Sequence, residues 1–205
     1  MLIKVDKINI ERILCDAVEM LKNGGIVAYP TETFYGLGAK FDIENSLKRL
    51  YDMKKRPQDK AMPLIIGDTR LLSIIAAHAD KKAITLMECF WPGPLTLILP
   101  ARESISAFLT AGTHKVAVRV PGESFALHLA RAAGFPITAT SANPSGLSPA
   151  READTVFRYF GDQVDLIIDA GPSPGGLPST IVEATNDGIK VLREGVIRKE
   201  SLFTP

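Results

Sequence analysis

The chain has 205 residues, of which 46% are apolar and 23% charged, and this balance excludes wholesale disorder. Its 24 Lys and Arg against 23 Asp and Glu give a net charge of +1, which argues against a dedicated nucleic-acid binder but allows a local basic patch. Lys4, Asp6 and Lys7 stand where a signal peptide needs an apolar core, so we expect a soluble, cytoplasmic protein without a membrane segment. Cys15 and Cys89 lie outside any Cys/His cluster, which predicts two buried free thiols and no metal site.

Helical and extended patterns alternate along the chain. Helical spacing of apolar residues covers 11–23, 44–54, 69–90 (one or two helices), about 123–133 and 150–160. Short apolar runs predict strands at 25–29, 63–66, 95–99, 116–120, 136–140, 166–169, 180–183 and 189–192, and residues 30–38 are predicted to form a loop of defined shape. This order favours one layered α+β (α/β-like) domain over residues 1–205 with a mixed sheet.

Several common catalytic and nucleotide-binding motifs are missing. The sequence contains no GxxxxGK[ST], no GxGxxG after a strand, no HExxH and no GxSxG. His78, His114 and His128 are scattered, and we expect them at the surface or in helices rather than as catalytic bases. Hydrolysis by a nucleophile and a histidine is therefore poorly supported.

Positive charge is concentrated in residues 48–60, which carry six Lys or Arg and two Asp, a net charge of +4. Pro57 ends the predicted helix directly after Lys54 and Arg56, so these cations lie at the end of an element, where sites collect. Arg offers a forked donor to phosphate oxygens and Lys a mobile point charge. Either a polyphosphate or an RNA backbone would suit this segment, as would a plain solvated helix face.

Small polar side chains and two arginines mark other strand ends. The loop 141–149 follows an apolar strand and is rich in Ser, Asn and Gly, which can form a turn or cradle phosphate. Residues 178–180 likewise place small hydroxyl side chains next to a strand. Arg119 interrupts an apolar strand and needs a carboxylate partner from the protein or a ligand, and Arg193 closes the last strand. Cations and hydroxyls without a nucleophile indicate phosphoryl or nucleotidyl transfer.

Seven short motifs occur in the order seen in the YrdC family, which the chain resembles over about residues 10–198. They are Pro30-Thr-Glu-Thr-Phe-Tyr-Gly-Leu-Gly38, Lys54-Lys-Arg-Pro57, Trp91-Pro-Gly-Pro-Leu-Thr96, Val116-Ala-Val-Arg-Val-Pro121, Ser141-Ala-Asn-Pro-Ser-Gly146, Pro178-Ser-Thr180 and Leu192-Arg-Glu-Gly195. The resemblance implies a twisted, mostly mixed sheet flanked by helices with a concave basic face. We expect the single-domain form, without the second C-terminal domain of some relatives.

The resemblance also implies an enzyme, an L-threonylcarbamoyladenylate synthase of the nucleotidyltransferase type. Such an enzyme makes threonylcarbamoyl-adenylate from L-threonine, bicarbonate or CO2 and ATP, and releases pyrophosphate. ATP is a substrate, with Mg2+ bound to it, and a downstream tRNA-modifying transferase complex uses the product to make threonylcarbamoyladenosine.

By the same resemblance, Lys54 and Arg56 are the expected catalytic residues. Lys54, Arg56, Lys60, Ser141, Asn143 and Arg193 are expected to bind ATP. Threonine is expected to contact Thr31, Thr33, Arg119, Ala139 and Ser179, with its carboxylate on Arg119.

Three alternatives stay open at this point. The first is an RNA-binding protein that uses the basic 48–60 face, and weak tRNA or double-stranded RNA binding could accompany catalysis. The second, a carbamoyl-transferring relative in hydrogenase maturation, would carry acylphosphatase and zinc-finger segments for which this sequence has no room. The third is a family member of undefined activity.

Overall fold

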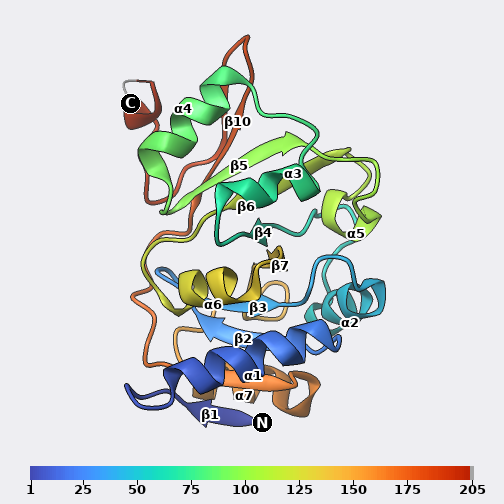
Figure 1. The fold of residues 1–205 in the computed structure, drawn as a ribbon, viewed down its shortest axis with the longest axis vertical. Helices are drawn as coiled ribbons and strands as arrows, with labels where there is room; N and C mark the ends of the chain where they lie inside the picture. Colours follow the sequence, from blue (N-terminus) through green and yellow to red (C-terminus); the bar gives the residue numbers. More distant parts are fainter. Residues whose placement is uncertain (204–205) are drawn as a thin grey trace.

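A computed structural model describes residues 1–203, whose strands form two sheets, one in each half of the molecule (Figure 1). The five-stranded sheet has the order β1-β9-β2-β3-β8, with β1 (Leu2–Lys4), β2 (Val27–Pro30), β3 (Tyr35–Gly38), β8 (Thr140–Ser141) and β9 (Leu166–Asp169). The six-stranded sheet has the order β11-β10-β5-β6-β4-β7, with β4 (Leu64–Ile65), β5 (Leu95–Pro100), β6 (Lys115–Arg119), β7 (Ile137–Thr138), β10 (Thr180–Ala184) and β11 (Ile189–Arg193).

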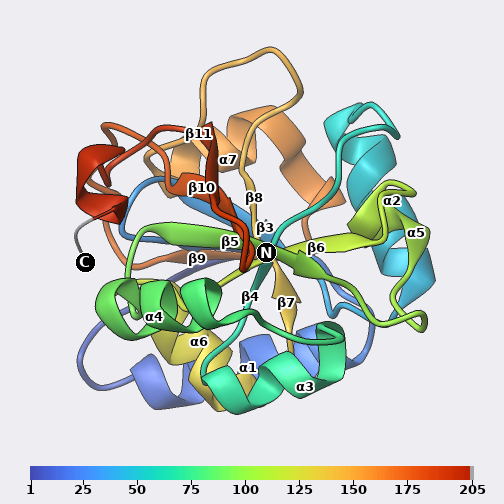
Figure 2. The same cartoon turned by 90° about the horizontal axis from the view of Figure 1, so that it is seen from above.

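Helices cover both sides of these strands, with α1, α3, α4 and α6 along one side and α7 on the other (Figure 2). The helices are α1 (Ile10–Lys22), α2 (Glu44–Lys54), α3 (Leu72–Ile75), α4 (Lys81–Phe90), α5 (Ala107–Thr110), α6 (Phe125–Ala133) and α7 (Ala153–Phe160). Single 3-10 turns lie at Thr69–Leu71, Gly161–Gln163 and Glu200–Leu202. None of the helices in residues 1–203 is both long and apolar enough to span a bilayer.

Strand β2 shows how the sequence builds the core. Successive side chains of a strand point to opposite faces, and every residue of β2 is buried because both faces are covered. Val27 and Tyr29 pack against the apolar face of α1 and against α6, whereas Ala28 faces the larger core cluster. That cluster includes residues of both sheets, for example Leu37 and Leu97, so it joins the two sheets.

Each sheet is mixed, which confirms the α+β class and the mixed sheet expected from the sequence. β1 runs parallel to β9 and β2 antiparallel to β3, while β10 runs parallel to β5 and β5 antiparallel to β6. The strands are divided between two sheets, however, and the single strand predicted for 136–140 is divided as well. β7 pairs in one sheet and β8 in the other, so Ala139 lies where the chain crosses between the sheets.

Some local predictions were wrong. Residues 35–38 form strand β3 rather than loop, since Gly36 and Gly38 leave room for the packing against β2; a Cβ on Gly38 would lie 2.7 Å from Tyr29. Cys15 and Cys89 are exposed free thiols rather than buried ones, because each lies on the outward face of an amphipathic helix. The edge strand β1 and the one-turn helix α5 were not predicted.

Candidate active site

Segments from both sheets surround a cavity of about 670 Å³. They are the turn between β2 and β3, the ends of β6 and β11, the beginning of β10, and the crossing between β7 and β8. Pockets for small-molecule ligands commonly have volumes of ~300–1,000 Å³. Residues distant in sequence, from both sheets, therefore line one space large enough for such a ligand.

The turn between β2 and β3 is fixed by the hydroxyl of Thr31. Its Oγ1 accepts hydrogen bonds from the backbone N–H groups of Thr33 (3.1 Å) and Phe34 (3.3 Å) and donates one to the Phe34 carbonyl (2.7 Å). Because the Thr31 hydroxyl has one proton, the Thr33 hydroxyl must donate in the 3.1 Å contact between the two. The Thr33 oxygen, which lines the cavity, is left as an acceptor.

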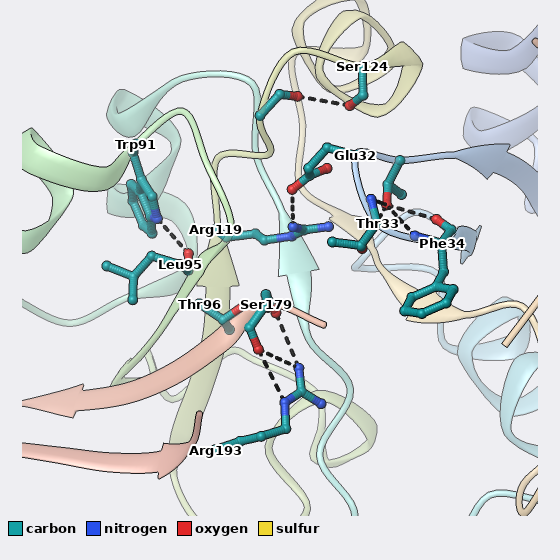
Figure 3. A network of polar contacts seen from close by, with 12 residues as sticks. Glu32, Thr33, Phe34, Trp91, Leu95, Thr96, Arg119, Ser124, Ser179 and Arg193 are labelled. Atoms are coloured by element: carbon teal, nitrogen blue, oxygen red, sulfur yellow. Dashed lines mark hydrogen bonds and ion pairs between the residues drawn. The ribbon is translucent and has the colours of Figure 1, made fainter. Parts of the chain in front are cut away.

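Arg119, at the end of β6, is 8% exposed and forms an ion pair through Nη1 with Oε1 of Glu32 (Figure 3). Glu32 lies between Thr31 and Thr33 in the same turn, so the turn places the carboxylate against the arginine. The carboxylate partner expected for an arginine in an apolar strand thus comes from the protein itself, as Glu32. Oε2 of Glu32 is buried and has no hydrogen-bond partner among residues 1–203.

Arg193, at the end of β11, reaches over the beginning of β10 (Figure 3). Its Nη2 donates to the carbonyl (2.8 Å) and the hydroxyl (3.2 Å) of Ser179, whose hydroxyl also lies 3.0 Å from that of Thr96. Partial burial and the nearby positive charge of Arg119 lower the pKa of Arg193. Two guanidinium groups therefore face the same space, with one carboxylate in contact with the first of them.

Arg56 follows the C-terminus of α2 and lines the cavity from another side. Its Nε donates to the carbonyl of Lys60 (3.0 Å) and its Nη2 to that of Ala61 (2.7 Å). The side chain of Lys60 itself is exposed and does not line the cavity. Arg56 thus orders the 57–61 turn while keeping a charge that no carboxylate in residues 1–203 neutralises.

Lys54 is only 2% exposed and braces the loop 141–149. Its Nζ donates to the carbonyls of Ser141 and Asn143, the latter at 2.6 Å, and its own carbonyl accepts from the N–H of Ser145 (2.9 Å). Asn143 closes the same loop through Nδ2, which donates to the carbonyl of Leu147 (2.6 Å). Burial, together with the charge of Arg56, lowers the pKa of Lys54 to about 7.

A family model of the Sua5, YciO and YrdC proteins, described as "Telomere recombination", matches residues 19–195. The chain belongs to the Sua5/YciO/YrdC family. This confirms the resemblance to YrdC proteins that the ordered motifs indicated.

Relatives within the Sua5/YciO/YrdC family carry a common name. The chain is 40% identical to the threonylcarbamoyl-AMP synthase of Bacillus subtilis, over 92% of this chain and 55% of that protein. It is 39% identical to the threonylcarbamoyl-AMP synthase of Idiomarina loihiensis, over 80% of this chain and 90% of that protein. The crystal structure of Pyrococcus abyssi Sua5 complexed with L-threonine superposes with a TM-score of 0.93 at 36% identity, and covers all of this chain and 60% of that one. The chain thus spans little more than half the length of the B. subtilis relative.

Most of the predicted site residues of this Sua5/YciO/YrdC protein lie around the cavity. Those that line it are Thr31, Thr33, Arg56, Arg119, Ala139, Ser141, Ser179 and Arg193. Lys54, Lys60 and Asn143 do not line it. The sequence reasoning missed Thr96, which lines the cavity, and Glu32, which does not line it but pairs with Arg119, although both lie inside motifs of the family pattern.

Proposed function

We propose that the chain synthesises threonylcarbamoyl-adenylate from L-threonine, bicarbonate or CO2 and ATP, with release of pyrophosphate. The names of the B. subtilis and I. loihiensis relatives and the threonine bound to P. abyssi Sua5 support this assignment. The observation that carries it is the cavity of about 670 Å³, which combines three guanidinium groups with threonine and serine hydroxyls. Such a lining holds anions together and neutralises developing charge.

The reaction has two steps in this proposal. The uncharged amine of threonine attacks CO2 and releases a proton to give a carbamate, and a carbamate oxygen then attacks the α-phosphate of ATP as pyrophosphate leaves. Both steps bring negatively charged groups together, so cations that stabilise the charge lower the barrier.

Arg56 and Arg193 are assigned to the phosphates of ATP. Both line the cavity, and their hydrogen bonds within residues 1–203 go to neutral carbonyl and hydroxyl oxygens. They can turn to a phosphate without leaving a carboxylate unpaired. Arg119 differs because Glu32 already occupies one of its donors, and we assign it to the carboxylate of threonine. Thr31, Thr33, Ala139 and Ser179 would complete the amino-acid subsite.

Lys54 and Asn143 are assigned to the nucleotide through the loop that they hold. Both bond to the backbone of residues 141–147 and neither lines the cavity, whereas Ser141 of that loop does. In this proposal they position Ser141 against a phosphate rather than touching the phosphate themselves. Lys60 is an exposed cation of the 57–61 turn that Arg56 orders, and we assign it to ATP as well.

Mg2+ enters with ATP as part of the substrate. Within residues 1–203 no group of three or more His, Cys, Asp or Glu gathers to hold a metal ion, so its ligands on this account are phosphate oxygens and water.

The product would pass to a tRNA-modifying transferase in the cytoplasm. Lys48 within α2 and Lys55 and Lys60 after it are exposed cations of the 48–60 segment that could bind tRNA weakly, which a salt-titrated filter-binding assay would measure.

The experiment that tests the proposal is pyrophosphate release from ATP, with L-threonine, bicarbonate or Mg2+ omitted in turn. We expect release only when all components are present. Tight RNA binding without any such turnover would instead favour the RNA-binding alternative.

A further inference from the structure

Three features of Glu32 together indicate a role beyond its ion pair with Arg119. It lies in the turn between two cavity-lining threonines, it contacts Arg119 through one oxygen, and its other oxygen is buried without a partner. A buried acceptor that lacks a donor is costly to a fold, so its persistence between cavity-lining Thr31 and Thr33 and beside cavity-lining Arg119 calls for a ligand that brings the donor.

The guanidinium of Arg119 also has N–H donors that are free to bind a ligand. It carries five N–H donors, and its only hydrogen bond within residues 1–203 is the one from Nη1 to Glu32. Arg119 can therefore hold a second carboxylate through its remaining donors while the bond to Glu32 stays in place. A ligand carboxylate held there lies directly beside the carboxylate of Glu32.

An α-amino acid matches this arrangement because its carboxylate and its ammonium group are attached to the same carbon atom. Adjacent positive and negative side chains are the complement of such a zwitterion. Resting on the proposed function, we propose that Glu32 binds the α-ammonium group of the amino-acid substrate while Arg119 binds its carboxylate. In this arrangement Oε1 keeps its bond to Arg119, and the ammonium group supplies the donor that Oε2 lacks.

This assignment makes Glu32 a specificity-determining residue for the amino group that is carbamoylated. The remaining cations of the cavity, Arg56 and Arg193, would repel an ammonium group, so the one carboxylate in contact with the cluster decides where the amine lies. A carboxylic acid without an amine would bind at Arg119 but gain nothing from Glu32.

The test compares L-threonine with 3-hydroxybutanoate, which is threonine without its amino group, by calorimetric titration of the full 205-residue chain. Glu32→Gln is expected to weaken binding of L-threonine roughly tenfold or more, the scale of one charge-assisted contact, and to leave 3-hydroxybutanoate unchanged or slightly tighter. Arg119→Gln is expected to weaken both ligands. Glu183→Gln, which breaks the pair with Lys115 at the other end of β6, is the control and should change neither.

Two outcomes would overturn the inference. One is a Glu32→Gln protein that loses affinity for both ligands equally, which would mean that Glu32 only orders Arg119. The other is a protein that loses affinity for neither. If Glu32→Gln does not fold, as judged by its thermal transition, Glu32→Asp keeps the charge at a shorter reach and should retain part of the preference for threonine.

Pyrophosphate release by the unmodified chain separates this inference from the proposed function. Threonine-dependent release together with an unselective effect of Glu32→Gln would overturn the role of Glu32 alone. Failure of the unmodified chain to bind threonine at all would overturn both.

Discussion

The buried lysine predicts a measurable dependence of stability on pH. Lys54 is 2% exposed, and its pKa is lowered from 10.5 to about 7 by burial and by Arg56. Between these two pKa values the unfolded chain binds a proton at this position that the folded chain does not. The free energy of unfolding must therefore rise with pH from about 7 toward 10.5 and be independent of this group below pH 7.

The size of the effect follows from the two pKa values. Each pH unit in which only the unfolded state is protonated adds about 1.4 kcal/mol to the free energy of unfolding. At pH 7 the folded lysine is half protonated, and by pH 9 it is almost fully neutral, while the unfolded lysine stays charged. The free energy of unfolding therefore rises by about 2 kcal/mol between pH 7 and pH 9.

Urea unfolding of the unmodified chain and of Lys54→Met at pH 7, 8 and 9 measures this gain. The variant has no titrating group at this position, so the difference in stability between the two proteins should grow by about 2 kcal/mol in favour of the unmodified chain. Lys48→Met, which removes an exposed lysine from the same helix, controls for the loss of one charge. A difference that stays constant from pH 7 to pH 9 would refute the reasoning.

Three further predictions concern single side chains. Tyr29→Phe removes a buried hydroxyl that donates to the carbonyl of Thr138 (2.9 Å) and should lower the free energy of unfolding by ~1–2 kcal/mol in urea; an unchanged midpoint would contradict this. Gly67→Ala should destabilise by ~1–3 kcal/mol, since a Cβ there would lie 2.6 Å from the backbone of Ala130, and an unchanged melting temperature would show that α6 can shift freely. Arg193→Gln should raise the half-saturating concentration of ATP about tenfold and that of threonine less, and steady-state kinetics with the reverse order would contradict its assignment to phosphate.

The fold was predictable where one physical signal dominated. Helix α1 has its apolar positions on one stripe, and its boundaries were predicted to within one residue. The division into two sheets could not be predicted, because it depends on which strands pair across long distances in sequence rather than on local periodicity. The crossing at Ala139 is an example: a single apolar run there serves two sheets.

The site was predictable in its composition but not in its contacts. A charge inside an apolar strand indicated that Arg119 needs a carboxylate, yet only the folded turn brings Glu32 to it. The cationic stretch of residues 48–60 likewise made Lys54 a candidate site residue. The sequence did not show that its side chain is buried, because the two carbonyls of the 141–149 loop that accept from its ammonium group are distant in sequence. Arg56, two residues later, instead points to the cavity.

The most direct test of the central claim follows the carbon atom that the proposed reaction incorporates. The 205-residue chain is incubated with ATP, Mg2+, L-threonine and 13C-labelled bicarbonate, and the adenylate product is examined by mass spectrometry. The account predicts an adenylate that contains both threonine and one labelled carbon, formed with an equal amount of pyrophosphate. An adenylate without the label, or none at all while the chain is folded, would contradict it.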